Sequence, residues 1–210
     1  MFNSSADRRP RLLALGDSYT IGEGVDAALR WPAQLAAGLR AQLIELDSVE
    51  IVASTGWTTD ELQQAIDARD FMPPYALVSL LIGVNNQYRG RDLDNYASEL
   101  AALLDFAVRM ADDDARKVIV VSIPDWGTTQ FAVAGQVDAT RVALEIDGFN
   151  AIARRTCEAR GAHWVDVTAI SRDQAREMLA DDGLHPSADQ YTLWVDAILP
   201  VARSILDVGD

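Results

Sequence analysis

The sequence predicts a doubly wound α/β domain, in which helices cover both faces of a parallel sheet. Short apolar runs alternate with longer segments of helical periodicity along the 210 residues. The apolar runs are near-continuous rather than alternating, which is typical of parallel strands buried on both faces. The length and the 49% content of hydrophobic residues suit a single domain over residues 1–210 with a sizeable core.

Five segments are predicted as buried strands because each is short and apolar. They are Arg11–Gly16, Val49–Ala53, Ala76–Ile82, Lys117–Ile123 and His163–Val167. Parallel strands bring their carboxyl ends to one edge of the sheet, and open α/β sheets bind ligands at that edge. Residues that directly follow these strands are therefore the first candidates for a site.

The segments between the strands contain apolar residues at helical spacing. The predicted helices are marked by Leu35, Leu39 and Leu43 after Pro32, a capping box from Thr58 to Glu61, the stripe from Leu93 to Ala111, Val142 to Ala153 within Arg141–Arg160, and a second capping box from Ser187 to Gln190. We expect the last helix to end or kink at Pro200, because proline lacks the N–H that an interior helical position uses. The segment Ala111–Asp114 is predicted to be a solvated loop.

Composition argues against several classes of function. The formal net charge of −14 disfavours binding to nucleic acids and to anionic membranes. No apolar run has transmembrane length and no secretory signal is visible, so we expect no membrane insertion and a cytoplasmic location. The single cysteine, Cys157, lies in a predicted helix, where we expect a buried structural thiol.

Three polar segments follow the first three predicted strands. Gly16-Asp17-Ser18 brings a hydroxyl to the sheet edge, and at Gly16 the backbone can turn without a side-chain clash. Ser54-Thr55-Gly56-Trp57 places a glycine N–H beside a helix N-terminus, and Gly83-Val84-Asn85-Asn86 supplies a neutral amide. Both kinds of donor can stabilise an oxyanion. Taken singly, each segment is explained at least as well as a turn or a helix cap, and for the second and third segments that explanation is the better one.

His185 is the candidate general base. The other histidine, His163, lies inside the last predicted strand, where a structural role is expected, whereas His185 lies in a loop before a capped helix. Asp182 can turn back to accept a hydrogen bond from one ring nitrogen, which leaves the other nitrogen free. The alternative is a surface Asp–His pair that caps the helix. With Ser18 and the oxyanion donors, this set fits acyl transfer through a covalent intermediate.

Gly16-Asp17-Ser18, Gly56, Gly83-Val84-Asn85 and Asp182-Gly183-Leu184-His185-Pro186 resemble, in the same order, the four sequence blocks of the SGNH or GDSL-type hydrolases. The resemblance implies a flavodoxin-like three-layer α/β/α sandwich with a five-stranded parallel sheet. It implies an esterase without metal or cofactor, in which Ser18 is the nucleophile and His185 is the base, oriented by Asp182. It also implies an oxyanion hole made by the N–H groups of Ser18 and Gly56 and the side-chain amide of Asn85.

Two residues depart from the family pattern. The third block often ends in aspartate, where this sequence has Asn86. We therefore expect the support of the loop that carries Asn85 to differ from that of its relatives. Ser18 is followed by Tyr19 rather than by the leucine of the family's common name.

The expected substrate is a small-molecule ester. The same mechanism would also serve a carbohydrate acetylesterase or a thioesterase. Trp57 and Trp126 are candidates to line an acyl or sugar site, and packing is an equally good explanation for both. The segment Asp125–Asp138 is polar and contains glycine, so we expect a mobile loop that covers the site.

Two alternatives come from other functional classes. The stretch Gly22-Glu23-Gly24-Val25-Asp26-Ala27 matches a loose nucleotide-binding pattern, but it begins beyond the first strand. The second strand also lacks the acidic residue that would bind a ribose, since it ends in Ala53 and Ser54. The other alternative is a carbohydrate- or acyl-binding protein without activity, which covalent labelling of Ser18 would exclude.

Overall fold

A five-stranded parallel sheet forms the centre of the computed structural model, which describes residues 9–174 and 177–207. The strands are β1 (Leu12–Gly16), β2 (Val49–Ala53), β3 (Leu77–Leu81), β4 (Val118–Val121) and β5 (His163–Val165). Neighbouring strands are parallel throughout, in the order β2-β1-β3-β4-β5. This order is the flavodoxin-like one, and the predicted fold class is confirmed.

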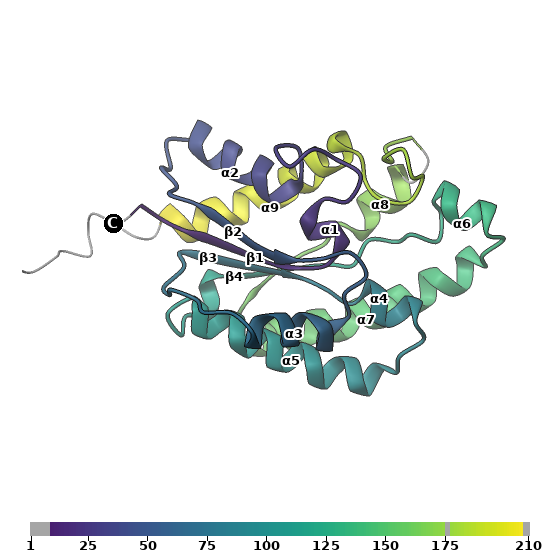
Figure 1. The fold of residues 1–210 in the computed structure, drawn as a ribbon, viewed down its shortest axis with the longest axis horizontal. Helices are drawn as coiled ribbons and strands as arrows, with labels where there is room; N and C mark the ends of the chain where they lie inside the picture. Colours follow the sequence, from purple (N-terminus) through teal and green to yellow (C-terminus); the bar gives the residue numbers. More distant parts are fainter. Residues whose placement is uncertain (1–8, 175–176, 208–210) are drawn as a thin grey trace, which may run out of the picture.

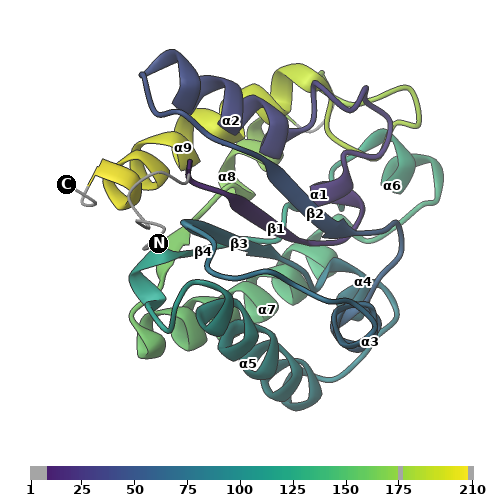
Figure 2. The same ribbon diagram turned by 60° about the vertical axis from the view of Figure 1, so that its left-hand side comes forward.

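Helices cover both faces of the sheet and make three layers (Figure 1). One face carries α2 (Trp31–Ala41), α8 (Thr168–Gln174) and α9 (Ala188–Asp207), and the other carries α3 (Thr59–Asp67), α5 (Leu93–Met110) and α7 (Ala139–Arg160). The short helices α1 (Ser18–Ile21), α4 (Val84–Tyr88) and α6 (Gln130–Ala134) lie toward the edge where the strands end (Figure 2), and a 3-10 turn, η2 (Ala115–Lys117), precedes β4. None of the helices in the described residues is long and apolar enough to cross a membrane.

Strands β4 and β5 end earlier than the sequence predicts, because side chains replace the hydrogen bonds of the sheet. After β4, the Asn150 amide binds both backbone groups of Ile123, accepting from its N–H at 2.8 Å and donating to its carbonyl at 3.0 Å. After β5, the Ser122 hydroxyl accepts from the N–H groups of Val167 at 2.8 Å and Thr168 at 3.1 Å. These buried contacts lead the chain out of the sheet at the edge that carries the candidate residues.

Helix starts are predicted better than helix ends. The capping box at Thr58 is present, with Glu61 Oε2 accepting from the Thr58 N–H at 2.9 Å. The placement of Leu43 in the preceding helix is wrong: α2 ends at Ala41, and Leu43 has a φ of 67° and is 90% exposed. The Ile44 N–H instead bonds back to the Leu39 carbonyl at 3.1 Å, which closes the helix.

The C-terminal helix continues through Pro200 to Asp207, so the expected end at Pro200 is wrong. Pro200 and Asp196, whose carbonyl the missing N–H would have bound, are both exposed, so water can satisfy that carbonyl. Only half of the second capping box forms. Ser187 Oγ accepts from the Gln190 N–H at 3.3 Å, whereas the Gln190 amide donates to the Met178 carbonyl at 3.0 Å.

Two smaller expectations are confirmed. The α5 helix ends at Met110, and the exposed Asp112 and Asp113 that follow adopt positive φ angles of 64° and 58°. Cys157 is a buried free thiol on α7. Burial raises the pKa of this thiol to about 11, as expected for a structural rather than a reactive cysteine.

Candidate active site

Ser18 begins α1, and only Asp17 separates it from the end of β1, so the sheet places Ser18 at the edge where the strands end. The preceding Asp17 caps the helix, and its Oδ1 accepts from the Tyr19 N–H at 3.1 Å. Gly16 is required here for space, because an added Cβ would lie 2.2 Å from Thr20 Oγ1 and 2.5 Å from the Leu81 carbonyl oxygen. The turn therefore packs too tightly for any side chain at its first residue.

The Asp17 carboxyl is fully buried beside the candidate nucleophile. Burial raises its pKa to about 7, although the hydrogen bond from the Tyr19 N–H opposes this effect. Among the described residues, no group forms a hydrogen bond with its second oxygen, Oδ2. Asp17 is thus a buried acid that titrates near neutral pH next to Ser18.

His185 is held in a tight turn of the chain. Leu179 and Pro186 form an antiparallel bridge, and the Ala180 N–H donates to the His185 carbonyl at 2.8 Å. Within this turn, Oδ2 of Asp182 lies 2.6 Å from Nδ1 of His185. The backbone of the turn therefore presents the Asp–His pair that the sequence predicts.

Asp182 is suited to orient an imidazole. Burial alone would raise its pKa, but hydrogen bonds from the His185 ring and from the N–H groups of Leu184 and His185 lower it below its ordinary value. Both N–H groups donate to Oδ1 at 2.9 Å, so Oδ2 remains for the ring. With Nδ1 engaged, Nε2 is the ring nitrogen left for a reaction. The Tyr19 ring and the imidazole pack in a T-shaped arrangement, with ring centroids 5.7 Å apart.

The two predicted oxyanion-donor segments are bound to each other. Asn85, on α4, donates from Nδ2 to the Trp57 carbonyl at 2.9 Å. Arg89 donates to the Gly56 carbonyl at 2.6 Å, and Gly56 has a φ of 84°, a backbone conformation that favours glycine. A side-chain amide carries two N–H groups, so one N–H of Asn85 remains for a ligand. The contact with Trp57 fixes the direction of that amide.

One pocket of about 210 Å³ brings together Ser18, Asn85 and His185. Gly56 and Trp57 do not line it, and Trp57 instead packs partly buried against the hydrophobic core. Trp126 does line it, so of the two tryptophans that the sequence singles out, only Trp126 borders this pocket. The predicted site residues thus converge, with Gly56 one step away, next to the carbonyl group that holds Asn85.

Five further residues complete the pocket wall without having been predicted as substrate contacts: Tyr19, Val84, Tyr88, Phe131 and Leu184. For four of them, a position close to a predicted site residue in the sequence could have indicated a place in the pocket wall. Tyr19, Val84 and Leu184 adjoin a site residue in the sequence, and Tyr88 lies three positions after Asn85, on the same face of α4. Phe131 had no such signal, because α6 alone brings it to the site.

The segment Asp125–Asp138 is not the plain loop that the sequence predicts. It contains α6, whose first residues the Thr129 side chain caps, and the Phe131 N–H donates to the Gly183 carbonyl at 2.9 Å. Its start is fixed by Asp125, whose carboxylate accepts from Arg172 at 2.9 Å. The segment therefore forms a wall of the pocket that is bonded to the His185 turn.

The glycine pattern of the nucleotide-binding alternative has another role. Gly22 ends α1 with a φ of 75°, and a Cβ on Gly24 would lie 2.6 Å from that of Ala180 in the His185 turn. The next helix, α2, begins only at Trp31, so the pattern does not open a helix that could hold a phosphate. Among the described residues, no group of three or more His, Cys, Asp or Glu side chains is placed to hold a metal ion.

Comparisons with known proteins agree with this fold. The model of the GDSL-like lipase/acylhydrolase family matches residues 14–193. The solved structure of TesA is similar with a TM-score of 0.72 at 19% identity, over 93% of this chain and 99% of that chain. The psychrotrophic esterase EstA from Pseudoalteromonas sp., inhibited by monoethylphosphonate, has a TM-score of 0.71 at 17% identity, over 94% of this chain and 98% of that chain.

A third similar structure is that of Axe2, an acetylxylan esterase from Geobacillus stearothermophilus, with a TM-score of 0.70 at 19% identity. The similarity covers 92% of this chain and 94% of that chain. A comparison with curated protein sequences finds no match. At these identities the structures establish the fold, while the family model spans all four sequence blocks. The chain therefore belongs to the GDSL-like lipase/acylhydrolase family, a family of ester hydrolases.

Proposed function

We propose that this protein is a serine esterase that hydrolyses small carboxylic esters through an acyl-enzyme on Ser18. The observation that carries the proposal is the convergence of Ser18, Asn85 and His185 on one pocket, with Asp182 2.6 Å from the far side of the imidazole. This arrangement supplies a nucleophile, a base with its orienting group, and an oxyanion donor.

In the first half of the proposed reaction, Ser18 Oγ attacks the ester carbonyl carbon while His185 Nε2 accepts the hydroxyl proton. Negative charge then develops on the carbonyl oxygen. The amide of Asn85 and the N–H groups of Ser18 and Gly56 stabilise this charge, and one donor of this kind typically contributes about 10²–10³ in rate. The Asp182 carboxylate stabilises the imidazolium that forms.

In the second half, the imidazolium of His185 protonates the leaving alkoxide, and the carbon–oxygen bond of the ester breaks. Water then attacks the acyl-enzyme, with His185 again as base, and the acid leaves Ser18. Asp182 must stay ionised throughout, and its lowered pKa supports that role. Thioesters and carbohydrate acetates would pass through the same steps.

The pocket wall supports a short, apolar acyl group as the preferred substrate. Val84, Phe131 and Leu184 line it, together with the rings of Tyr88 and Trp126. A volume of about 210 Å³ lies below the roughly 300–1,000 Å³ of pockets for drug-sized ligands. We therefore expect acetate to butyrate esters to be turned over faster than longer ones.

The test is hydrolysis of p-nitrophenyl esters from acetate to decanoate by the wild type, Ser18→Ala and Ser204→Ala. Ser204 is an exposed serine on α9 and serves as the matched control. We expect Ser18→Ala to lose about 10⁴-fold or more in kcat, because nucleophile and base act as a unit. Turnover that survives in Ser18→Ala would overturn the proposal.

Phosphonate labelling separates an inactive enzyme from a binding protein. A fluorophosphonate forms a covalent bond only with an activated serine, so mass spectrometry should place the adduct on Ser18 and on no other residue. An unlabelled protein that hydrolyses none of the oxygen esters, thioesters or carbohydrate acetates would favour the non-catalytic alternative.

A further inference from the structure

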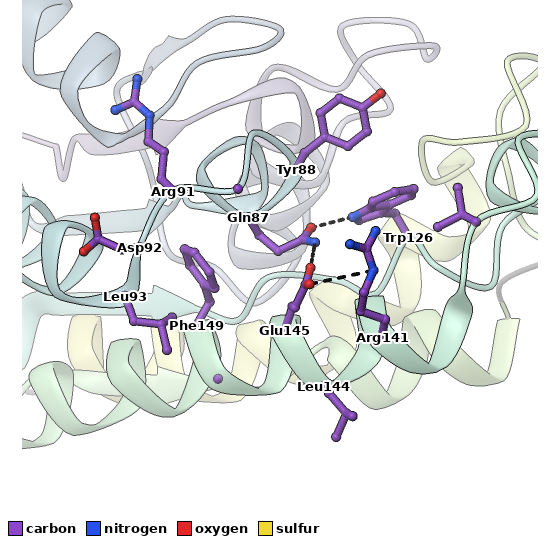
Figure 3. A pocket seen from close by; sticks show the side chains of 13 residues that line it. Gln87, Tyr88, Arg91, Asp92, Leu93, Trp126, Arg141, Leu144, Glu145 and Phe149 are labelled. Carbon is purple, nitrogen blue, oxygen red and sulfur yellow. Dashed lines mark hydrogen bonds and ion pairs between the residues drawn. The ribbon is translucent and has the colours of Figure 1, made fainter.

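A second and larger hollow adjoins the pocket of Ser18, Asn85 and His185, which we call the catalytic pocket. Figure 3 shows the side chains that line this second hollow. This outer hollow has a volume of about 630 Å³ and lies between α4, the start of α5 and α7. Of the described residues, Tyr88 and Trp126 line both the outer hollow and the catalytic pocket. These two side chains therefore form the boundary between the two spaces.

The indole of Trp126 is fixed in this boundary by a chain of hydrogen bonds. Its Nε1–H donates to Oε1 of Gln87 at 2.8 Å, and Nε2 of Gln87 donates to Oε2 of Glu145 at 2.6 Å. Arg141 pairs with the other Glu145 oxygen, Oε1 (Figure 3), and its Nε lies 3.8 Å from that atom. Gln87 is only 5% exposed, and its amide oxygen and amide nitrogen both take part in these hydrogen bonds. Its side chain is therefore held in one orientation.

Two aromatic rings contact the same indole. Tyr88 packs against it in a T-shaped arrangement with ring centroids 5.3 Å apart, and Phe131 does so with ring centroids 6.4 Å apart. Trp126 is only 6% exposed, whereas Tyr88 is 59% exposed. The indole is thus the buried part of the boundary and the tyrosine its outer part.

The two spaces differ in what they can hold. The outer hollow falls within the size range of ligand pockets, and the catalytic pocket falls below it. Leu93, Leu144 and Phe149 give the outer hollow an apolar wall, and Leu144 is 68% exposed. Beyond Trp126, the outer hollow would offer apolar surface to an acyl chain too long for the catalytic pocket.

We propose that Trp126, held by Gln87, limits the acyl chain length that this enzyme accepts, and that the outer hollow is the space a longer chain enters once the indole is removed. The inference rests on the proposed esterase function and goes beyond it by naming the residue that sets the substrate class. In a hydrophobic pocket, one extra methylene on the substrate changes kcat/KM by about 10–200-fold. The position of the Trp126 wall should therefore have a large effect on which acyl chains are hydrolysed.

The experiment compares kcat/KM for p-nitrophenyl acetate, butyrate and decanoate in the wild type, Trp126→Ala, Trp126→Leu and Tyr88→Ala. We expect the wild type to turn over decanoate at least tenfold less efficiently than butyrate. Trp126→Ala should raise the ratio of kcat/KM for decanoate to kcat/KM for butyrate at least tenfold. Trp126→Leu and Tyr88→Ala lose less packing and should shift the ratio in the same direction. They replace Trp126→Ala in the comparison if that variant does not fold.

Gly148 provides the control that identifies the outer hollow as the space entered. It lines that hollow from α7, and a Cβ there would meet only Leu93 Cδ1 at 3.7 Å and Cδ2 at 4.0 Å, which are ordinary contacts. Gly148→Leu should leave the wild-type rates unchanged. Combined with Trp126→Ala or Trp126→Leu, it should occupy part of the outer hollow and reduce the gain on decanoate.

Three outcomes would overturn the inference. They are a wild type that already prefers decanoate, folded Trp126 and Tyr88 variants that keep the wild-type chain-length profile, and a gain on decanoate that Gly148→Leu does not reduce. Failure of the esterase function is a separate result, seen as acetate turnover that does not depend on Ser18. In that case binding of free decanoate is the measurement, and Trp126→Leu should bind it at least tenfold more tightly than the wild type.

Discussion

Asn86 and Thr59 are joined by two hydrogen bonds that tie α4 to the first residue of α3. Asn86 Oδ1 accepts from the Thr59 N–H at 3.0 Å, and Asn86 Nδ2 donates to the Thr59 hydroxyl at 2.6 Å. That hydroxyl in turn donates to the carboxylate of Glu99 on α5. Because the Thr59 proton is already engaged, residue 86 must be a donor, which explains an amide where the family often has aspartate.

We predict that Asn86→Asp destabilises the protein by about 1–3 kcal/mol, since both partners of the Thr59 hydroxyl would then be acceptors in a buried place. Urea unfolding followed by circular dichroism measures the loss. Adding Glu99→Gln should recover most of it, because the new amide can donate to Thr59 and free its proton for residue 86. Equal stability of wild type and Asn86→Asp would contradict this account.

We predict that Asp182→Asn lowers kcat by about 10⁴-fold with little change in KM. An asparagine would turn an N–H toward His185 Nδ1 and force the ring proton onto Nε2, which could then no longer accept the Ser18 proton. The measurement is steady-state hydrolysis of p-nitrophenyl acetate. The neighbouring Asp181 is exposed, and Asp181→Asn should keep the rate within about twofold. A loss shared by both variants would point to damage to the turn instead.

We predict that Asp17→Asn flattens the pH dependence of stability between about pH 4 and pH 7. The folded-state pKa of Asp17 is raised from 3.8 to about 7, so in this window the unfolded chain gives up a proton that the folded chain retains. Stability therefore falls as pH rises through the window, and the difference between the two pKa values corresponds to about 4 kcal/mol.

The asparagine can keep the hydrogen bond from the Tyr19 N–H without this penalty. Urea unfolding at several pH values between 4 and 8 should show the variant gaining on the wild type as pH rises, by an amount of that order. A constant difference between the two proteins would show that Asp17 ionises normally.

We predict opposite effects for alanine at two glycines. Gly16→Ala should cost about 3 kcal/mol or more, because its Cβ would overlap Thr20 Oγ1 and the β3 backbone at Leu81. Gly148→Ala should be neutral or stabilise by up to about 1 kcal/mol, since it has space and lies inside a helix. Denaturation midpoints of the two variants give the comparison, and a tolerated Gly16→Ala would show that the turn after β1 can relax.

The sequence by itself determined the architecture and the positions of the four site segments. Near-continuous apolar runs are typical of strands in parallel sheets, so the pattern was enough to find all five strands of the sheet. The expectation of full burial holds for β1, β3 and β4, whereas the edge strands β2 and β5 are only partly buried because each has one neighbouring strand. The Asp182–His185 pair was also readable, since a spacing of three residues lets one short turn bring both side chains together. Such features depend on residues close in the sequence.

The tertiary structure decided what depends on partners far along the chain. Strands β4 and β5 end where Asn150 and Ser122 replace sheet hydrogen bonds, and neither side chain is marked as a cap by its own neighbours. Phe131 reaches the pocket only because α6 is bonded to the His185 turn. Trp126 faces the pocket, whereas Trp57 packs on the core, although both follow a strand. Local pattern fixes which residues are apolar, but only the packing of distant segments fixes where each of them points.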